Sequence, residues 1–222
     1  MREKNTNNFK KALHSKINRS IVYYGHKTLP HSLFIMGNKI VPTDPRELMR
    51  LAKEGDADAF GKIYELYFTP VFRYIYLRVN NKQDAEDLAQ VVFLKVYASI
   101  SRFEEQGKSP LSYFFTVARN TIIDHWRKKK DVLFENQEEY TAQTDSRTEN
   151  PDDVIQKNET ENMLRRAIQE LTEEQQSVII LKFINDFSNK EISTMLQKKE
   201  ETIRQIQCRA IKTLRQHLKK YG

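Results

Sequence analysis

Residues 84–100 read DAEDLAQVVFLKVYASI, and this stretch carries the clearest amphipathic pattern in the chain. At about 100° per residue, its apolar side chains fall within one stripe about 100° wide. The stripe is formed by Ala85, Ala89, Val92, Phe93, Val96 and Ile100. Asp84 and Asp87 share a second face, whereas Glu86 points nearly opposite to Asp84. The stretch therefore predicts a helix with one buried side and a carboxylate-bearing exposed side.

Further helices are predicted on both sides of this one. Asp44-Pro45 and Ser109-Pro110 are helix starts, Thr172 to Gln175 form a capping box, and Ser188 is an N-cap. Pro70 should kink or break the helix that Asp56 opens. The expected helices cover residues 45–54, 56–79, 84–100, 110–130, 162–171, 173–185, 189–196 and 200–219.

The fold class that these patterns predict is all-α, with two small helical domains. Only 6 Gly and 6 Pro occur in 222 residues, too few for the frequent turns of a β-sandwich or barrel. The expected organisation is a disordered or loosely ordered extension over 1–42, a helical domain over 43–130, a flexible acidic linker over 131–162, and a second domain over 163–222. The final helix pair has helix-turn-helix spacing. The extension could also be untranslated, since Met36 is a plausible start.

The net charge of +7 is unevenly distributed. Residues 1–42 carry +7, residues 43–130 carry +3, residues 131–162 carry −8 and residues 163–222 carry +5. Two basic blocks joined by an acidic tether indicate two nucleic-acid contacts with a connector that avoids phosphates. An acidic loop without any role explains the linker's composition equally well.

Several classes of function are excluded or disfavoured. One cysteine, Cys208, leaves no disulfide framework, redox pair or cysteine-based zinc cluster. No apolar run approaches the roughly 18–20 residues that span a bilayer, so we expect no membrane insertion and a cytoplasmic location. No catalytic triad, phosphate-binding glycine loop or metalloprotease motif occurs, and His125 and His217 are isolated. We therefore expect no enzyme activity, no cofactor and no metal.

The last helix presents a candidate duplex-DNA surface. Its buried side should comprise Ile203, Ala210, Ile211, Leu214 and Leu218. The opposite side carries Thr202, Gln205, Arg209 and Lys212, with Arg204, Cys208 and Arg215 at its edge. Arg, Gln and Thr side chains can hydrogen-bond base edges, while Lys198, Lys199 and Lys212 suit phosphates. A merely solvated helix face is the alternative, and the helix-turn-helix position favours DNA binding over it.

The helix predicted from Pro110 presents a second candidate surface. Its sequence places Tyr113-Phe114-Phe115 before Arg119-Asn120 and Trp126-Arg127-Lys128-Lys129-Lys130. Aromatic rings can stack on unstacked bases while cations bind the backbone, as single-stranded DNA requires. The alternative is that the aromatics are core and the basic run is a solvated helix end. We expect Phe114 to be core and Trp126 with the basic run to be exposed.

These pieces together resemble the extracytoplasmic-function group of bacterial RNA polymerase sigma factors over residues 44–222. Residues 56–74 resemble the first helix of their region two, residues 84–96 the helix that docks on the polymerase clamp, and residues 118–127 the promoter-melting helix. Residues 171–215 resemble region four. The resemblance implies a dissociable initiation subunit that binds core RNA polymerase, duplex promoter DNA and the melted strand, with an anti-sigma factor as a further candidate partner.

The resemblance also implies roles for individual residues. Core-polymerase contacts would be made by Asp84, Asp87 and Gln90. Minus-ten DNA contacts would be made by Phe103, Lys108, Tyr113, Arg119, Asn120, Trp126, Arg127 and Lys128, with the loop 103–109 holding a flipped base. Minus-thirty-five contacts would be made by Lys198, Lys199, Thr202, Arg204, Gln205, Arg209 and Lys212.

Six positions depart from the family pattern. Val91 stands where an acid is usual, Tyr113 where a Trp is common and Gln197 where a turn glycine is usual, while Glu201, Ile206 and Gln207 replace the usual Gly, Arg and Leu. Glu200 and Glu201 would repel nearby phosphates. Two other functions compete: a helix-turn-helix regulator acting without polymerase, and a nuclease, which lacks a convincing metal site.

Overall fold

The computed structural model describes residues 35–36, 39–40, 44–104, 109–135 and 159–220. Lys108 and residues 136–158 of the expected linker lie outside the described residues. The helices are α2 (Pro45–Lys53), α3 (Ala57–Val79), α4 (Lys82–Ser99), the 3₁₀ turn η1 (Ile100–Arg102), α5 (Pro110–Glu135), α6 (Glu159–Gln169), α7 (Glu173–Ile179), the π-helical turn η3 (Ile180–Ile184), α8 (Asn189–Leu196) and α9 (Glu200–Lys220). The all-α prediction is confirmed for this helical body.

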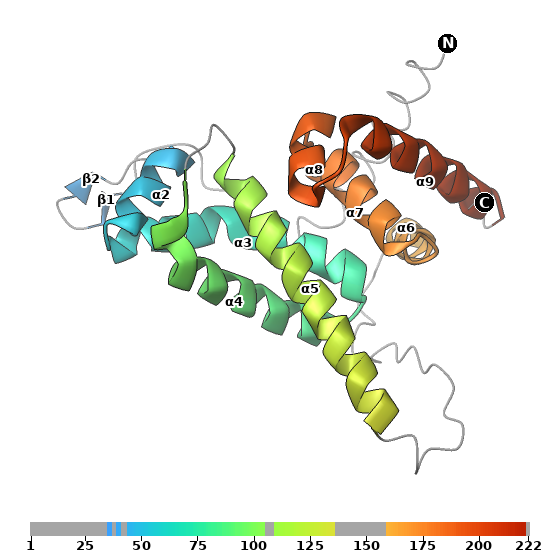
Figure 1. The fold of residues 1–222 in the computed structure, drawn as a ribbon, viewed down its shortest axis with the longest axis horizontal. Coiled ribbons are helices and arrows are strands. Elements are labelled where there is room, and N and C mark those ends of the chain that lie inside the picture. The colour runs from blue at the N-terminus through green and yellow to red at the C-terminus, as the bar shows by residue number, and fades with distance from the viewer. Residues whose placement is uncertain (1–34, 37–38, 41–43, 105–108, 136–158, 221–222) are drawn as a thin grey trace.

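The helices form two bundles (Figure 1). We call α2 to α5 the N-terminal bundle and α6 to α9 the C-terminal bundle. In the first, α3 packs against α2, α4 and α5; in the second, α9 packs against α6, α7 and α8. The bundles also touch each other, because α5 packs against α8 and α3 packs against α6 and η3.

Helix α4 buries the stripe that its sequence predicts. Ala85, Ala89, Val92 and Val96 have no exposed surface, and Phe93 and Ile100 are also buried. Asn81 caps the helix, since its side chain accepts a hydrogen bond from the Asp84 N–H at 2.9 Å. Burial of this stripe fixes which side of α4 faces solvent.

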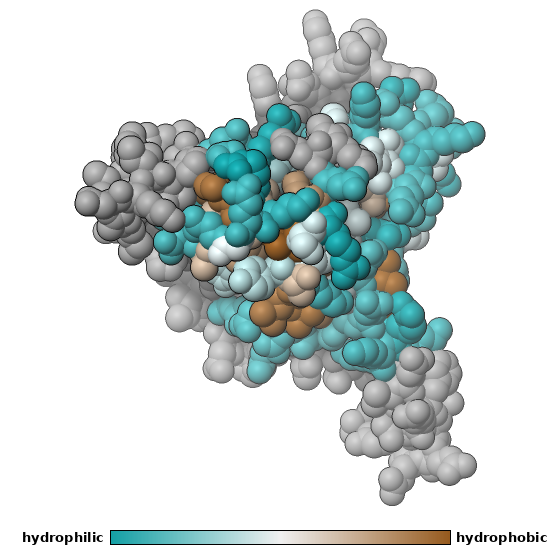
Figure 2. Space-filling view, turned by 60° about the vertical axis from the view of Figure 1, so that its left-hand side comes forward, coloured by the Kyte–Doolittle hydropathy of each residue, from teal (hydrophilic) through white to brown (hydrophobic). Residues whose placement is uncertain are grey.

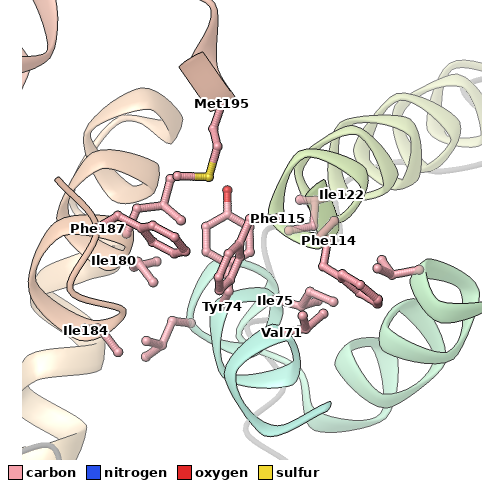
Figure 3. Close-up of a cluster of buried hydrophobic side chains, with 14 of the residues drawn as sticks. Val71, Tyr74, Ile75, Phe114, Phe115, Ile122, Ile180, Ile184, Phe187 and Met195 are labelled. Atoms are coloured by element: carbon pink, nitrogen blue, oxygen red, sulfur yellow. The ribbon is translucent and has the colours of Figure 1, made fainter. Parts of the chain in front are cut away.

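Helix α3 is continuous through Pro70, so the expected break is wrong. A proline inside a helix removes one backbone hydrogen bond. Here the part of the helix that follows Pro70 is held by packing against other helices, since Val71, Tyr74 and Ile75 are fully buried (Figure 3). Tyr67, one turn earlier, lies in the same core, and its burial raises the pKa of its hydroxyl to about 12. Tertiary packing therefore outweighs the local penalty at Pro70.

Two other expectations about the ends of elements are corrected. Helix α5 continues to Glu135 rather than ending near Lys130, and α6 begins at Glu159, so both extend into the segment expected to be linker. A pair of two-residue antiparallel strands, β1 (Ile35–Met36) and β2 (Lys39–Ile40), lies within the segment expected to have no regular structure. Neither difference alters the helical body that carries the candidate sites.

Both helix starts predicted in the C-terminal bundle are confirmed as capping boxes. The Gln175 N–H donates to Thr172 Oγ1 at 3.4 Å, and the Gln175 side chain accepts from the Thr172 N–H at 3.1 Å. Ser188 and Glu191 make the same reciprocal pair at 3.2 and 2.8 Å. Each box satisfies two backbone donors that a helix start would otherwise leave without partners. The Ser188 box sets where α8, the first helix of the helix-turn-helix, begins.

Replacing Ser188 with alanine should therefore destabilise the protein by about 1 kcal/mol. The measurement is urea unfolding followed by circular dichroism, with the midpoint and slope compared with those of the original chain. Ser193→Ala is the matched control, because the Ser193 hydroxyl only donates to the Lys190 carbonyl within the same helix. Equal stability of the two variants would contradict the capping role.

Candidate nucleic-acid and partner interface

The exposed side of α4 combines carboxylates with apolar side chains. Asp87 and Gln90 are exposed and Asp84 is half-buried, so the three residues predicted to contact core polymerase lie on an accessible side. Val91 and Leu94 continue the same face and are 38% and 68% exposed. Such exposure of large apolar side chains beside acids is typical of a protein-binding surface.

Aromatic residues of α3 extend this apolar surface. Tyr97 of α4 is 51% exposed and meets Phe60 edge to face at 4.8 Å between ring centroids. Tyr64 is 39% exposed and packs on Phe68 and Phe93 at 5.1 and 4.7 Å. Figure 2 shows apolar surface interrupting the hydrophilic surface of the molecule. The sequence analysis did not predict that α3 contributes aromatic side chains to this surface. The four-residue spacing of Phe60, Tyr64 and Phe68 could have indicated it, because residues so spaced share one helix face.

Polar contacts connect α4 to α5. His125 Nε2 lies 3.8 Å from Asp84 Oδ2. Lys95 Nζ donates to Thr121 Oγ1 at 3.2 Å and lies 3.7 Å from Asp124 Oδ2. These contacts hold the predicted polymerase-binding helix and the predicted minus-ten helix in one register.

Two aromatic side chains, Phe103 and Tyr113, pack together at the start of α5. Phe103 and Tyr113 pack with ring centroids 5.4 Å apart, and the Tyr113 hydroxyl shares a 2.7 Å hydrogen bond with Ser99 Oγ. Lys53 Nζ donates to the Phe103 carbonyl at 3.0 Å. Phe103 and Tyr113, both predicted to contact minus-ten DNA, are thus brought together and are half-exposed.

Further along α5, the predicted minus-ten residues do not all share one environment. Asn120, Arg127 and Lys128 are exposed. Arg127 Nη2 donates to Asp124 Oδ1 at 2.7 Å, so its charge is partly neutralised. Arg119 instead lines a cavity between the two bundles. Trp126, expected to be exposed, is half-buried, because the Arg78 guanidinium lies 4.8 Å from its ring centroid.

The α8–α9 pair forms the predicted helix-turn-helix. The turn residue Gln197 adopts φ 53° and ψ 44°, the left-handed conformation, which explains why a glycine is usual there. In α9, Ile203, Ala210 and Leu214 are buried as expected, while Ile211 and Leu218 are half-buried. Ile206 joins the buried side at 5% exposure, which the sequence pattern had not indicated. An apolar residue in place of the usual Arg at 206 therefore serves packing.

The opposite side of α9 is open to solvent. Its exposed residues are Arg204, Gln205, Arg209 and Lys212; Thr202 is half-buried. Lys199 is exposed in the turn, whereas Lys198 is half-buried and ion-paired with Glu174 at 2.8 Å. The predicted minus-thirty-five set thus lies on one side of the second helix, except that Lys198 turns toward α7.

Arg204 is held by the two acids that begin α9. Its guanidinium pairs with Glu200 Oε1 at 2.7 Å and with Glu201 Oε2 at 3.2 Å. An arginine engaged by two carboxylates is less available to a base or phosphate, because DNA must displace both partners. The two acids also place negative charge in the first turn of α9, close to the residues predicted to contact DNA.

Neutralising these acids in the double variant Glu200→Gln, Glu201→Gln should therefore tighten duplex-DNA binding several-fold at low salt, chiefly through its non-specific part. Fluorescence anisotropy with a labelled duplex, repeated at several salt concentrations, measures the affinity and its salt dependence. Glu170→Gln is the control, because Glu170 is an exposed acid outside α9. Unchanged affinity would show that the acids do not compete with phosphates.

Metal chemistry and membrane insertion find no support in the described part of the chain. No group of three or more His, Cys, Asp or Glu side chains there could hold a metal ion. No described helix has the length and apolar character needed to cross a bilayer.

The described bundles define a helical DNA-binding protein in which a helix-turn-helix unit is joined to a second unit that exposes an acidic and apolar face. Two family models match it: Sigma-70 region 2 over residues 63–132 and Sigma-70, region 4 over residues 161–214. The chain belongs to the sigma-70 family of RNA polymerase sigma factors, in its extracytoplasmic-function group.

Individual relatives support this assignment. The chain is similar to the ECF RNA polymerase sigma factor BldN of Streptomyces coelicolor, with 33% identity over 168 residues, covering 76% of this chain and 63% of BldN. It is 28% identical over 183 residues to the ECF RNA polymerase sigma factor SigW of Bacillus subtilis, covering 78% of this chain and 96% of SigW. The chain thus spans less than two thirds of BldN but nearly all of SigW.

Solved structures share the fold. The sigma factor RpoE of Bartonella quintana, solved in complex with the anti-sigma factor NepR, aligns with a TM-score of 0.60 and 20% identity, covering 73% of this chain and 98% of RpoE. CnrH, solved with the cytosolic domain of CnrY, aligns with a TM-score of 0.61 and 16% identity, covering 80% of this chain and 99% of CnrH.

Proposed function

We propose that this chain is an alternative sigma factor that binds core RNA polymerase and directs promoter recognition and melting. The observation that carries the proposal is the presence of three different surfaces in one chain. They are the acidic and apolar face of α4, the aromatic and basic face of α5, and the exposed polar face of α9. Each has the chemistry that one step of initiation requires.

The α4 face is the docking site for core polymerase. Asp84, Asp87 and Gln90 supply charge and hydrogen-bond acceptors at its N-terminal half. Val91 and Leu94 supply apolar surface at its C-terminal half, and burying such surface favours association by about 25 cal/mol per Å². Val91, in place of the usual acid, shifts the contact from charge toward apolar packing.

The α5 surface binds the melted minus-ten strand. Phe103 and Tyr113 offer ring faces for an unstacked base, and Trp126 offers another farther along the helix. Asn120, Arg127 and Lys128 supply hydrogen bonds and positive charge along the exposed side, and Arg119, which lines the cavity between the bundles, completes the predicted set. A flipped base costs a few kcal/mol, which stacking and backbone contacts offset.

The α9 surface reads the minus-thirty-five element in the major groove. Gln205 and Arg209 are exposed at the middle of the helix and can reach base edges, and Arg204 joins them when it leaves Glu200 and Glu201. Lys199 and Lys212 contact phosphates, as does Lys198 when it leaves Glu174.

The remaining parts of the proposal concern partners and setting. Such a factor works where core polymerase is, in the cytoplasm, and contributes binding energy rather than a catalytic group. An anti-sigma factor is a further proposed partner. The support is that RpoE, which shares this fold, was solved in complex with the anti-sigma factor NepR.

Run-off transcription tests the proposal directly. The purified chain is added to sigma-free core polymerase with a library of promoter fragments from the host genome. Specific transcripts that need both components support it, and failure to bind core polymerase would overturn it. A helix-turn-helix regulator acting alone would bind duplex DNA in the same experiment without binding core. The exposed apolar residues of α4 disfavour that alternative, because duplex binding gives them no use.

A further inference from the structure

Arg78 of α3 is a buried arginine that has no carboxylate partner among the described residues. The residue is only 3% exposed, and its Nε has no hydrogen-bond partner within the described structure. Its Nη1 donates to the Tyr74 hydroxyl at 3.1 Å. Arginines this deeply buried are normally paired, because burying an unpaired charge is costly. The described side chains therefore leave this guanidinium short of an acceptor.

Neighbouring side chains fix where the Arg78 guanidinium lies. The Tyr74 hydroxyl donates in turn to Ser177 Oγ at 3.4 Å, and the Ser177 hydroxyl donates to the Glu173 carbonyl at 2.9 Å. The Trp126 ring centroid lies 4.8 Å from the guanidinium carbon. Figure 3 shows the Tyr74 hydroxyl at the edge of the apolar cluster. Only one of the five N–H donors of the guanidinium is used by these contacts, so the others are held in place for another acceptor.

Two further cations line the same cavity between the bundles. They are Arg119 of α5 and Lys198, which lies between α8 and α9. Arg119 is half-buried, and in the part of the chain that the structure describes its guanidinium makes no hydrogen bond or ion pair. Lys198 is ion-paired with Glu174 at 2.8 Å. Three elements distant in the sequence thus bring three cations to one cavity, and two of these cations are arginines without a carboxylate.

Two acids of α7 also line the cavity, and their charges must be weighed against the cations. Glu174 is already paired with Lys198, whereas Glu173 makes no ion pair within the described ranges. The five charged side chains leave the lining with one net positive charge. Both acids are exposed, so solvent screens their charges more strongly than that of the buried Arg78. The buried part of the lining therefore favours an anion.

We propose that this cavity binds a phosphate group. Guanidinium groups bind phosphate oxygens through paired N–H···O hydrogen bonds, which chloride cannot form because it is a single atom. A phosphate group presents oxygens in several directions, so Arg78, Arg119 and Lys198 can each donate to it. A carboxylate presents two oxygens in one plane and serves such a divergent set less well. The same donors recognise inorganic phosphate and the phosphate of a nucleotide, and the experiment separates these two sources.

Trp126 provides the readout, because it is the only tryptophan of the chain and lies against Arg78. Inorganic phosphate is titrated into the full-length chain at constant ionic strength, with sodium chloride as the compensating salt. We expect a saturable change in tryptophan emission. At ten times the half-saturating concentration, the thermal midpoint should rise by about 3–6 °C, since the ligand binds the folded chain.

Arg119→Gln removes one donor from the cavity and should raise the half-saturating phosphate concentration about tenfold. Arg127→Gln is the matched control and should leave that concentration unchanged. Arg127 is on the same helix and carries the same charge, but it is exposed and lies outside the lining of the cavity. Arg78→Lys keeps the buried charge but loses the planar set of donors, so it should also weaken binding. Because Arg119 is only half-buried, its variant remains informative if Arg78→Lys fails to fold.

Glu173→Gln tests the main competing explanation, in which the Glu173 carboxylate itself balances the two arginines through solvent. If the cavity is a phosphate site, this variant should bind phosphate several-fold more tightly, because a nearby like charge is removed. If Glu173 is the partner of the arginines, the variant should lose thermal stability without phosphate and show no gain in phosphate affinity. That second result would overturn the proposal.

AMP in place of inorganic phosphate distinguishes the two sources of the phosphate group. A saturable response to either probe that Arg119→Gln weakens and Arg127→Gln does not supports the site, and the probe that binds more tightly identifies the source. No saturable response to either probe, or equal weakening by the two variants, would overturn it. Neither polymerase nor DNA is present in these titrations, so their outcome is independent of the proposed function.

Discussion

Reversing the charge of Asp87 by Asp87→Lys should weaken binding to core polymerase by about 100-fold and abolish run-off transcription at limiting protein. Asp87 is exposed on the face of α4 that also carries Val91 and Leu94. A like-charge contact in an interface costs several kcal/mol, and disruption of a close charge pair costs about 2–5 kcal/mol. The affinity is measured by competition for fluorescently labelled core polymerase.

The matched control for this experiment is Glu86→Lys. Glu86 is an exposed acid one residue away, but it points to the other side of α4 from Asp84. Both substitutions change the net charge equally, so a general electrostatic effect would weaken both. Loss confined to Asp87→Lys supports the α4 docking face. Equal losses, or none, would contradict the assignment of that face while leaving the family membership intact.

Neither substitution should affect folding, so a difference in polymerase affinity between the two variants reports on the interface alone. The core side of α4 consists of apolar residues, and neither acid contributes to it. Exposed substitutions away from special features usually change stability by less than about 0.5 kcal/mol. Circular dichroism and the thermal midpoint of both variants check this before binding is measured.

Local sequence signals were sufficient for the elements whose stability is local. The stripe of α4 and the two capping boxes depend on residues within one or two turns of each other, and both kinds of prediction are confirmed. Pro70 was misjudged because the packing that holds α3 together comes from other helices. The sequence pattern also did not indicate that Ile206 is buried, because several apolar residues of α9 compete for one narrow buried side.

The packing between the two bundles could not be predicted from the sequence. Tyr74, Phe115 and Phe187 are aromatic residues at core-like positions of their own helices, and nothing in their spacing distinguishes contacts within a bundle from contacts between bundles. The same limit applies to Arg119 and Lys198, which are 79 positions apart in the sequence and line one cavity because the two bundles pack together. Long-range pairing is a property of the folded arrangement rather than of any local window.

Truncating Arg209 by Arg209→Ala should weaken binding to the promoter duplex by about 10- to 150-fold, the equivalent of about 1–3 kcal/mol for a lost bidentate base contact. Arg209 is exposed at the middle of α9, and its side chain donates from Nε to the Gln205 carbonyl at 3.5 Å, a hydrogen bond long enough to yield to DNA. Alanine favours the helix, so the fold should remain. The variant should also lose discrimination at one base pair of the minus-thirty-five element.

Lys212→Ala and Arg215→Ala make this prediction specific. Both residues are exposed on the same helix, one and about two turns beyond Arg209. Lys212→Ala should weaken binding to all sequences alike and reduce the salt slope by about one, as a phosphate contact does. Arg215→Ala, at the edge of the surface, should have a smaller effect. Arg209→Ala could instead behave like Lys212→Ala and leave the sequence preference unchanged. That result would show that Arg209 contacts phosphate and that Arg204 and Gln205 are the residues of α9 that contact bases.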